Sequence, residues 1–113
     1  MTNLDKKKCV PCEGGVERMR PEDIPAFLNQ LKPGWDVIDN LKIKKTYTFD
    51  SYMDGIEFVQ DLAAVSEEEG HHPVIHIYYG HVDVEFWTHA ILGLSENDFI
   101  MAAKTDLLES LKL

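Results

Sequence analysis

The sequence lacks the marks of a membrane or secreted protein. None of its apolar runs approaches the roughly 18 residues that a membrane-spanning helix needs, and its N-terminus has no apolar core of a secretory signal. Cysteine is scarce, because Cys9 and Cys12 are the only two, which is too few for a disulfide framework. We therefore expect a protein of a reducing compartment, the cytoplasm, that does not bind membranes.

Basic residues are also few. Eleven lysines and arginines stand against twenty acids, and the formal net charge is −9. An acidic surface repels phosphate groups, so direct binding to nucleic acid is not expected. The apolar fraction of 44% is that of a globular protein, and 113 residues is the length of one domain. We therefore divide the chain into an irregular lead-in, residues 1–18, and a single domain, residues 19–113.

Three segments have the apolar periodicity of amphipathic helices. They are residues 21–31, residues 52–69 and the stretch from Ser95 to the C-terminus. Ser51 stands before the second segment as a capping residue, and Gly70 follows it as a natural stop. The sequence therefore predicts three helices.

Two pairs of segments with alternating polarity lie between these helices. They are residues 35–38 with 41–49, and residues 74–79 with 82–87. Lys45 interrupts the alternation of the first pair. In the second pair, a two-residue turn at Gly80 and His81 would place Ile77 opposite Val84 and gather the apolar residues on one face. Both pairs predict β-hairpins.

The order of these elements predicts an α+β fold, α-β-β-α-β-β-α. Its economical packing is a four-stranded antiparallel sheet with all three helices on one face. The other face would carry Val74, Tyr78 and Trp87, which is more exposed apolar surface than a small monomer usually shows. We therefore predict a homo-oligomer, a homodimer or homotetramer, that associates through this face or through a sheet edge.

Histidine is concentrated in one part of the chain. All five histidines fall within residues 71–89, and His71 and His72 follow the end of the second helix. A helix C-terminus and the acidic run at residues 67–69 both favour a protonated imidazole, which can donate a proton near neutral pH. His89 lies where the chain leaves the last strand. This grouping predicts a histidine acid–base site.

Simpler interpretations of these residues stay open. A His-His-Pro sequence after a helix is typical of a solvated turn. His76 opposite Glu85 fits a surface cross-strand pair, and His81 in a turn is expected to be exposed. Asp98 stands three residues after Ser95, which a helix start would use without any catalytic role.

Metal binding has weak support in the sequence. The histidine spacings fit neither H-x-x-x-H on a helix nor H-x-H on a strand, so no metal is expected. Cys9 and Cys12 form a C-x-x-C without a second pair at zinc-finger spacing, away from any strand-to-helix turn. We expect structural or incidental thiols, with redox and metal roles as alternatives.

The histidines belong to a longer pattern. In chain order it comprises Glu67, His71-His72-Pro73, Tyr79, Thr88-His89, Gly93-Leu94-Ser95-Glu96 and Asp98, with Gly34-Trp35 before the first strand. This set, together with the order of elements over residues 21–111, resembles the pterin-4a-carbinolamine dehydratase family.

The resemblance implies a reaction that the residues alone do not name. The family substrate is 4a-hydroxytetrahydrobiopterin, which loses water to give quinonoid dihydrobiopterin during tetrahydrobiopterin recycling. Such a protein would be a carbon–oxygen hydro-lyase that needs no metal or redox cofactor. Its partner would be a small pterin.

The resemblance also implies a set of site residues. Catalysis would fall to His71, His72, His89 and Asp98, and substrate binding to Glu67, Pro73, Trp87 and Thr88. His71 and His89 would flank the 4a-carbon as acid and base, and His72 would orient the substrate. Asp98 would hold a histidine while also capping the last helix.

Other functions remain as alternatives. Some members of the family act as dimerisation cofactors of a transcription factor, and a role in molybdenum-cofactor metabolism has been suggested for others. This sequence departs from many relatives at Ile75, where they have an aromatic residue, and carries a cysteine-containing lead-in found in only some of them. A histidine metal protein is a third possibility.

Overall fold

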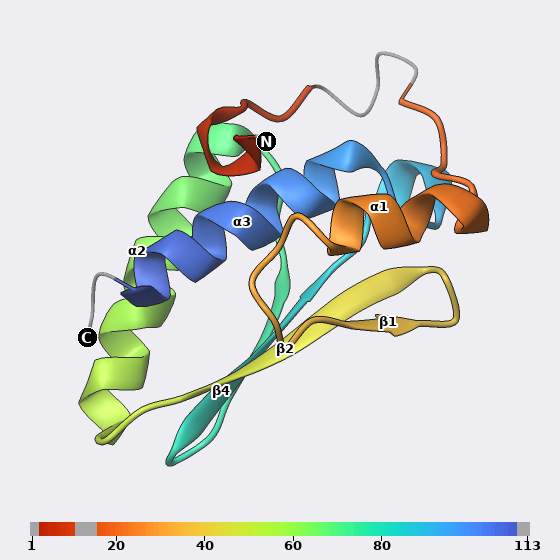
Figure 1. Cartoon of the computed structure of the whole chain (residues 1–113). Coiled ribbons are helices and arrows are strands. Elements are labelled where there is room, and N and C mark those ends of the chain that lie inside the picture. Colours follow the sequence, from red (N-terminus) through yellow and green to blue (C-terminus); the bar gives the residue numbers. More distant parts are fainter. Residues whose placement is uncertain (1–2, 11–15, 111–113) are drawn as a thin grey trace.

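The computed structural model describes residues 3–10 and 16–110 and shows one sheet with helices on one side (Figure 1). The four strands are antiparallel in the order β1-β2-β4-β3, so β1 and β3 are the edges. The predicted α+β fold is confirmed. Cys12 and Leu111 lie outside the described residues.

The elements agree in number and order with the sequence-based expectation, apart from short 3₁₀ turns. In chain order they are η1 (Leu4–Lys6), η3 (Pro21–Asp23), α1 (Ile24–Leu28), β1 (Asp36–Ile38), β2 (Lys42–Thr48), α2 (Tyr52–Glu69), β3 (Val74–Ile77), β4 (His81–Phe86), η4 (His89–Ile91) and α3 (Glu96–Ser110). No helix among the described residues is long and apolar enough to cross a membrane.

The helix α2 has the predicted bounds, and both predicted end signals are in place. The Ser51 hydroxyl accepts a hydrogen bond from the Asp54 amide at 3.1 Å. Gly70 ends the helix in the left-handed conformation with φ 67°, which glycine adopts without steric cost. The glycine therefore sets the direction in which the following histidines leave the helix.

The first helix is shorter than predicted. The sequence indicated residues 21–31, but the regular helix α1 is Ile24–Leu28, preceded by the turn η3. The amides of Gln30 and Leu31 donate to carbonyls three residues back, as in a 3₁₀ turn. The chain tightens there because Lys32-Pro33 ends the helix soon afterwards.

The predicted register of the second hairpin is wrong by two residues. Ile77 lies opposite Val82 rather than Val84, because the turn is centred on Tyr79 and Gly80. The Tyr78 amide donates to the His81 carbonyl at 2.9 Å across this turn. A shift of two residues keeps every side chain on its face, so the burial pattern could not reveal the error.

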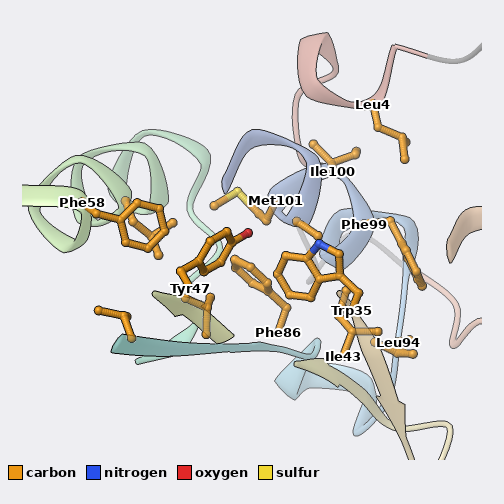
Figure 2. Close-up of a cluster of buried hydrophobic side chains, with 14 of the residues drawn as sticks. Leu4, Trp35, Ile43, Tyr47, Phe58, Phe86, Leu94, Phe99, Ile100 and Met101 are labelled. Carbon is orange, nitrogen blue, oxygen red and sulfur yellow. The ribbon is translucent and has the colours of Figure 1, made fainter. Parts of the chain in front are cut away.

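The core lies between the sheet and the helices (Figure 2). Aromatic side chains from several elements meet there, with the Trp35 and Phe86 ring centroids 6.0 Å apart. Phe58 and Phe99 bring α2 and α3 onto this cluster, and both are fully buried. The core therefore fixes α2 and α3 against β4.

Lys45, which broke the alternation of β2, lies on the inner face. Its ammonium group is 2.7 Å from the Asp106 carboxylate on α3. The same carboxylate accepts hydrogen bonds from the Tyr47 hydroxyl at 2.6 Å and the Trp35 indole at 3.0 Å. Burial, and then the Asp106 charge, raise the pKa of Tyr47 far above its usual range. A buried polar cluster thus joins β2 to α3.

Candidate active site

A buried chain of hydrogen bonds starts at His71. The side chain of His71 is 6% exposed, and its Nε2 is 2.6 Å from Asp98 Oδ1. The other carboxylate oxygen, Oδ2, accepts hydrogen bonds from the Thr88 hydroxyl at 2.8 Å and the Ser95 amide at 3.0 Å. Asp98 therefore caps the start of α3 and holds His71 at the same time.

Thr88 is placed behind the Asp98 carboxylate. Its side chain is fully buried, and its hydroxyl is also 2.7 Å from the Ser95 hydroxyl. Its backbone pairs with Gly93, with the Thr88 amide donating to the Gly93 carbonyl at 2.8 Å. This pairing closes a short loop that begins at His89 and contains η4. The network that holds His71 thus also anchors the segment that carries His89.

His89 lies on the surface beside Trp87. The two rings are stacked with centroids 4.4 Å apart and an angle of 26° between their planes. Lys42 places its ammonium group 5.6 Å from the centre of the Trp87 ring. His89 is exposed, so it can exchange protons with a bound molecule or with water.

A cavity adjoins the Trp87 ring. It has a volume of about 290 Å³ and is lined by Ile38, Asp39, Leu41, Lys42, Trp87 and Leu92. Its walls are mostly apolar, with one lysine and one aspartate. Such a cavity suits a small planar ligand with a few polar groups.

His72 and Glu67 form a second pair. His72 Nε2 is 2.7 Å from Glu67 Oε2, and the two side chains are 59% and 79% exposed. Water screens a pair this exposed, so it contributes little to folding. Pro73 is half-buried and leads into β3. Glu67, the first residue of the acidic run at residues 67–69, thus contacts the histidine pair at His72.

The structure places the remaining histidines away from this chain of hydrogen bonds. His76 Nε2 is 3.8 Å from Glu85, and the His81 ring stacks on Tyr78 at 4.3 Å. The Cys9 thiol is 3.8 Å from the Asn97 carbonyl. Across residues 3–10 and 16–110, no group of three or more histidine, cysteine, aspartate or glutamate side chains is arranged to hold a metal ion.

Two neighbours of the site were not identified from the sequence. Phe86 lies parallel to the His71 ring, with centroids 6.4 Å apart. Ser95 was identified only as a helix cap, although its hydroxyl also bonds Thr88. The strand alternation predicts Phe86 on the apolar face of the second hairpin but does not indicate its contact with His71. The Ser95–Thr88 contact joins two loops and leaves no local sequence signal.

Comparison with known sequences gives the same family across most of the chain. The family model described as pterin 4 alpha carbinolamine dehydratase matches residues 17–108. A relative from Nitrosomonas eutropha, named "Putative pterin-4-alpha-carbinolamine dehydratase", is 49% identical over 111 residues, covering 96% of this chain and 97% of its own length. A relative of the same name from Rickettsia bellii is 45% identical over 108 residues, covering 96% of each chain.

Two solved structures have a similar fold. A crystal structure of a transcriptional coactivator/pterin dehydratase from Brucella melitensis has a TM-score of 0.78 and 28% identity, covering 82% of this chain and 99% of its own. A pterin dehydratase-like protein, described as a RuBisCO assembly factor in the alpha-carboxysome, has a TM-score of 0.59 and 29% identity, covering 67% of this chain and 89% of its own. The chain belongs to the pterin-4-alpha-carbinolamine dehydratase family.

Proposed function

We propose that the protein catalyses the dehydration of a 4a-hydroxytetrahydropterin, with tetrahydrobiopterin recycling as its setting. The observation that carries the proposal is the buried His71–Asp98 pair, joined through Thr88 to the loop that presents His89. A histidine held by a buried carboxylate in this way is a typical acid–base device. Family membership supplies the substrate class.

The reaction removes one water molecule and involves no change of oxidation state. An acid protonates the 4a-hydroxyl group, and the bond between C4a and oxygen breaks with its electron pair leaving on water. The nitrogen lone pair at N5 forms the C4a=N5 double bond, and a base accepts the N5 proton. The site must therefore present one proton donor and one proton acceptor to adjacent atoms of the ring.

In this proposal His71 and His89 are the acid–base pair. Asp98 orients the His71 ring and stabilises the charge that the imidazole carries when it takes up a proton. His72, held by Glu67, orients the substrate from the end of α2. Thr88, which the resemblance gave as substrate-binding, takes the role of a positioning residue in this proposal, because its side chain is fully buried and its hydroxyl is engaged by Asp98 and Ser95.

The cavity beside Trp87 supports the placement of the pterin ring. A planar heterocycle can stack on the exposed part of the Trp87 or His89 ring and bury its apolar edge in the cavity. By the family resemblance, the backbone at Pro73 would also contact the ring. The proposed substrate-binding residues are thus Glu67, Pro73 and Trp87.

A non-catalytic binding role is the second candidate. It is favoured by the structural relative described as an assembly factor and by the exposed aromatic side chains of Tyr78 and Tyr79, which are 48% and 87% exposed. A protein that only binds a partner has no need of a buried His71–Asp98 pair. The geometry of this pair therefore favours the enzyme.

A coupled assay tests the proposed function. A tetrahydropterin-dependent aromatic hydroxylase generates the 4a-carbinolamine, and its decay is followed by absorbance with and without the protein. We expect the decay to be faster than the spontaneous dehydration in proportion to protein concentration. Decay at the spontaneous rate, with folded protein and saturating substrate, would favour the binding role.

A further inference from the structure

The N-terminal lead-in is attached to α3 by a paired contact. Asn97, the second residue of α3, is 2% exposed and faces Val10 with both ends of its amide. Its Oδ1 accepts a hydrogen bond from the Val10 amide at 3.0 Å, and its Nδ2 donates to the Val10 carbonyl at 2.8 Å. This pair of hydrogen bonds fixes both the position and the direction of the segment.

A second group of contacts attaches the same segment to α2. Glu69, the last residue of α2, accepts a hydrogen bond from the Cys9 amide at 2.8 Å. The Glu69 carboxylate is also 3.8 Å from the Lys104 ammonium group on α3, and Lys104 donates to the Asp5 carbonyl at 2.9 Å. We call residues 3–10 the N-terminal strap.

The strap is also anchored in the core. Leu4, on η1, is 2% exposed and belongs to the same buried cluster as Ile100 on α3 (Figure 2). The strap lies along α3 and beside the C-terminal end of α2 (Figure 1). Its contacts at Glu69 and Lys104 are largely buried, with side-chain exposures of 8% and 16%. Hydrogen bonds sheltered in this way hold geometry better than exposed ones.

Both attachment points adjoin the His71–Asp98 pair along the chain. Asn97 immediately precedes Asp98, and Glu69 is two residues before His71. The 2.6 Å contact between His71 Nε2 and Asp98 Oδ1 depends on where the end of α2 lies relative to the start of α3. The strap is bonded to both of these ends.

We propose that the N-terminal strap positions the His71–Asp98 pair for the proposed dehydration, with Asn97 and Glu69 as positioning residues. This inference rests on the proposed function. A displacement of about 1 Å at an acid–base group can lower turnover by about 10²-fold. Loss of the strap contacts therefore lowers kcat by weakening the His71–Asp98 hydrogen bond, while KM changes little because neither residue contacts the substrate.

The test compares variants of the full chain at a temperature where each is folded. Asn97→Ala removes the paired contact to Val10, and Glu69→Ala removes the contact to Cys9. Lys7→Ala is the matched control. Lys7 lies on the same strap, but among the described residues its side chain makes only an exposed ion pair, with Glu96 on α3. Circular dichroism and the unfolding temperature establish that each variant is folded.

Two measurements are made on each variant. The first is the proton NMR signal of the His71 ring N–H that faces Asp98, which a short charge-assisted hydrogen bond shifts downfield. The second is kcat and KM for the carbinolamine. The NMR signal does not depend on the substrate, so it tests the strap even if the proposed reaction is wrong.

We expect Asn97→Ala and Glu69→Ala to move or broaden the His71 signal and to lower kcat by about tenfold, with KM within about twofold. Lys7→Ala should match the parent protein in both measurements. An unmoved His71 signal and unchanged kcat in both folded variants would overturn the inference, even if their unfolding temperatures fall. If Asn97→Ala does not fold, Glu69→Ala alone decides the outcome in the same terms.

Discussion

Asp98 serves two structural purposes with one carboxylate, since it caps α3 through Ser95 and holds His71. Replacement by asparagine keeps the shape but removes the charge and one acceptor oxygen. We expect Asp98→Asn to lower turnover by about tenfold to a hundredfold and the free energy of unfolding by about 1–3 kcal/mol. The coupled assay measures the first effect and urea unfolding the second.

Asp83 provides the control for this prediction. It is also a largely buried carboxylate, 8% exposed, but it lies on the outer face of the sheet, bonded to Thr46 at 2.6 Å. Asp83→Asn should leave turnover as in the parent protein. Equal losses of turnover in the Asp98 and Asp83 variants would show that general destabilisation, and not the His71 contact, explains the result.

The exposed histidines allow a test with little risk to the fold. His72 and His89 lie on the surface, so alanine there leaves the core intact. We expect each of His72→Ala and His89→Ala to lower turnover by roughly tenfold or more, since acid–base groups commonly contribute 10²–10⁴-fold. The spontaneous dehydration limits the measurable range. Stopped-flow decay of the carbinolamine is the measurement, and parent-like rates in both variants would contradict the assigned site.

We expect Asp83 to make the stability of the protein depend on pH. The hydrogen bond from Thr46, followed by the charge of Lys44, lowers the pKa of Asp83 below its ordinary value of 3.8. At pH values between the lowered pKa and 3.8, the native state therefore binds fewer protons than the unfolded state, and stability rises with pH. The contribution is complete above pH 3.8 and is lost as the pH falls through the lowered pKa. The free energies of urea unfolding of the parent protein and Asp83→Asn should differ above pH 3.8 and converge below the lowered pKa of Asp83.

At the level of elements, the polar cluster around Asp106 links β2 to α3. Lys45→Met leaves the Asp106 carboxylate buried without its cation, and we expect a loss of about 3–5 kcal/mol in the free energy of unfolding. Lys45→Met combined with Asp106→Asn removes both charges. The amide oxygen of the asparagine can accept from the Trp35 indole while its NH2 group donates to the Tyr47 hydroxyl oxygen, so most of the loss should be recovered. Urea unfolding measures both. A loss below about 1 kcal/mol in the single variant would mean that the pair behaves as a surface ion pair.

The elements show which sequence signals are decisive. Ser51 and Gly70 act on their own neighbours, so the bounds of α2 could be predicted from local chemistry. The register of β3 against β4 could not, because a turn at Gly80 and His81 and one at Tyr79 and Gly80 bury the same face. The position of the turn depends on contacts such as the Tyr78–His81 stack that the hydrophobic pattern does not contain.

The same distinction applies to the site. His71 and Asp98 could be selected from the sequence, because residue type and the family pattern single them out. Their contact at 2.6 Å, and the Thr88 hydroxyl behind it, depend on the packing of three separate segments. The sequence likewise does not show that Glu67 and Glu69 of the acidic run contact different parts of the chain. Glu67 contacts His72 at the surface, whereas Glu69 turns towards the N-terminal strap.

At the scale of the whole molecule, the outer face of the sheet is less apolar than the sequence suggested. Tyr78 is covered in part by His81, and Trp87 by Lys42 and His89. Between them the inner strand β4 carries Asp83 and Glu85, and Glu85 is paired with Lys42 at 3.1 Å. A surface of paired charges associates less readily than an apolar one. We therefore place the expected self-association at a sheet edge rather than on this face.

The edge strand β3 is the stronger candidate for that contact. It lies at the end of the strand order, so one side of its backbone has no partner within the sheet, and Ile77 is 43% exposed there. We expect light scattering to give a mass of two or four times 12.9 kDa for the parent protein. Ile77→Lys places a charge at this edge and should lower the mass towards that of the monomer, because edge lysines oppose strand pairing. Lys44→Ala, on the outer face, is the control and should keep the parent mass. Loss of assembly in the Lys44 variant, with assembly kept in Ile77→Lys, would instead place the contact on the outer face of the sheet.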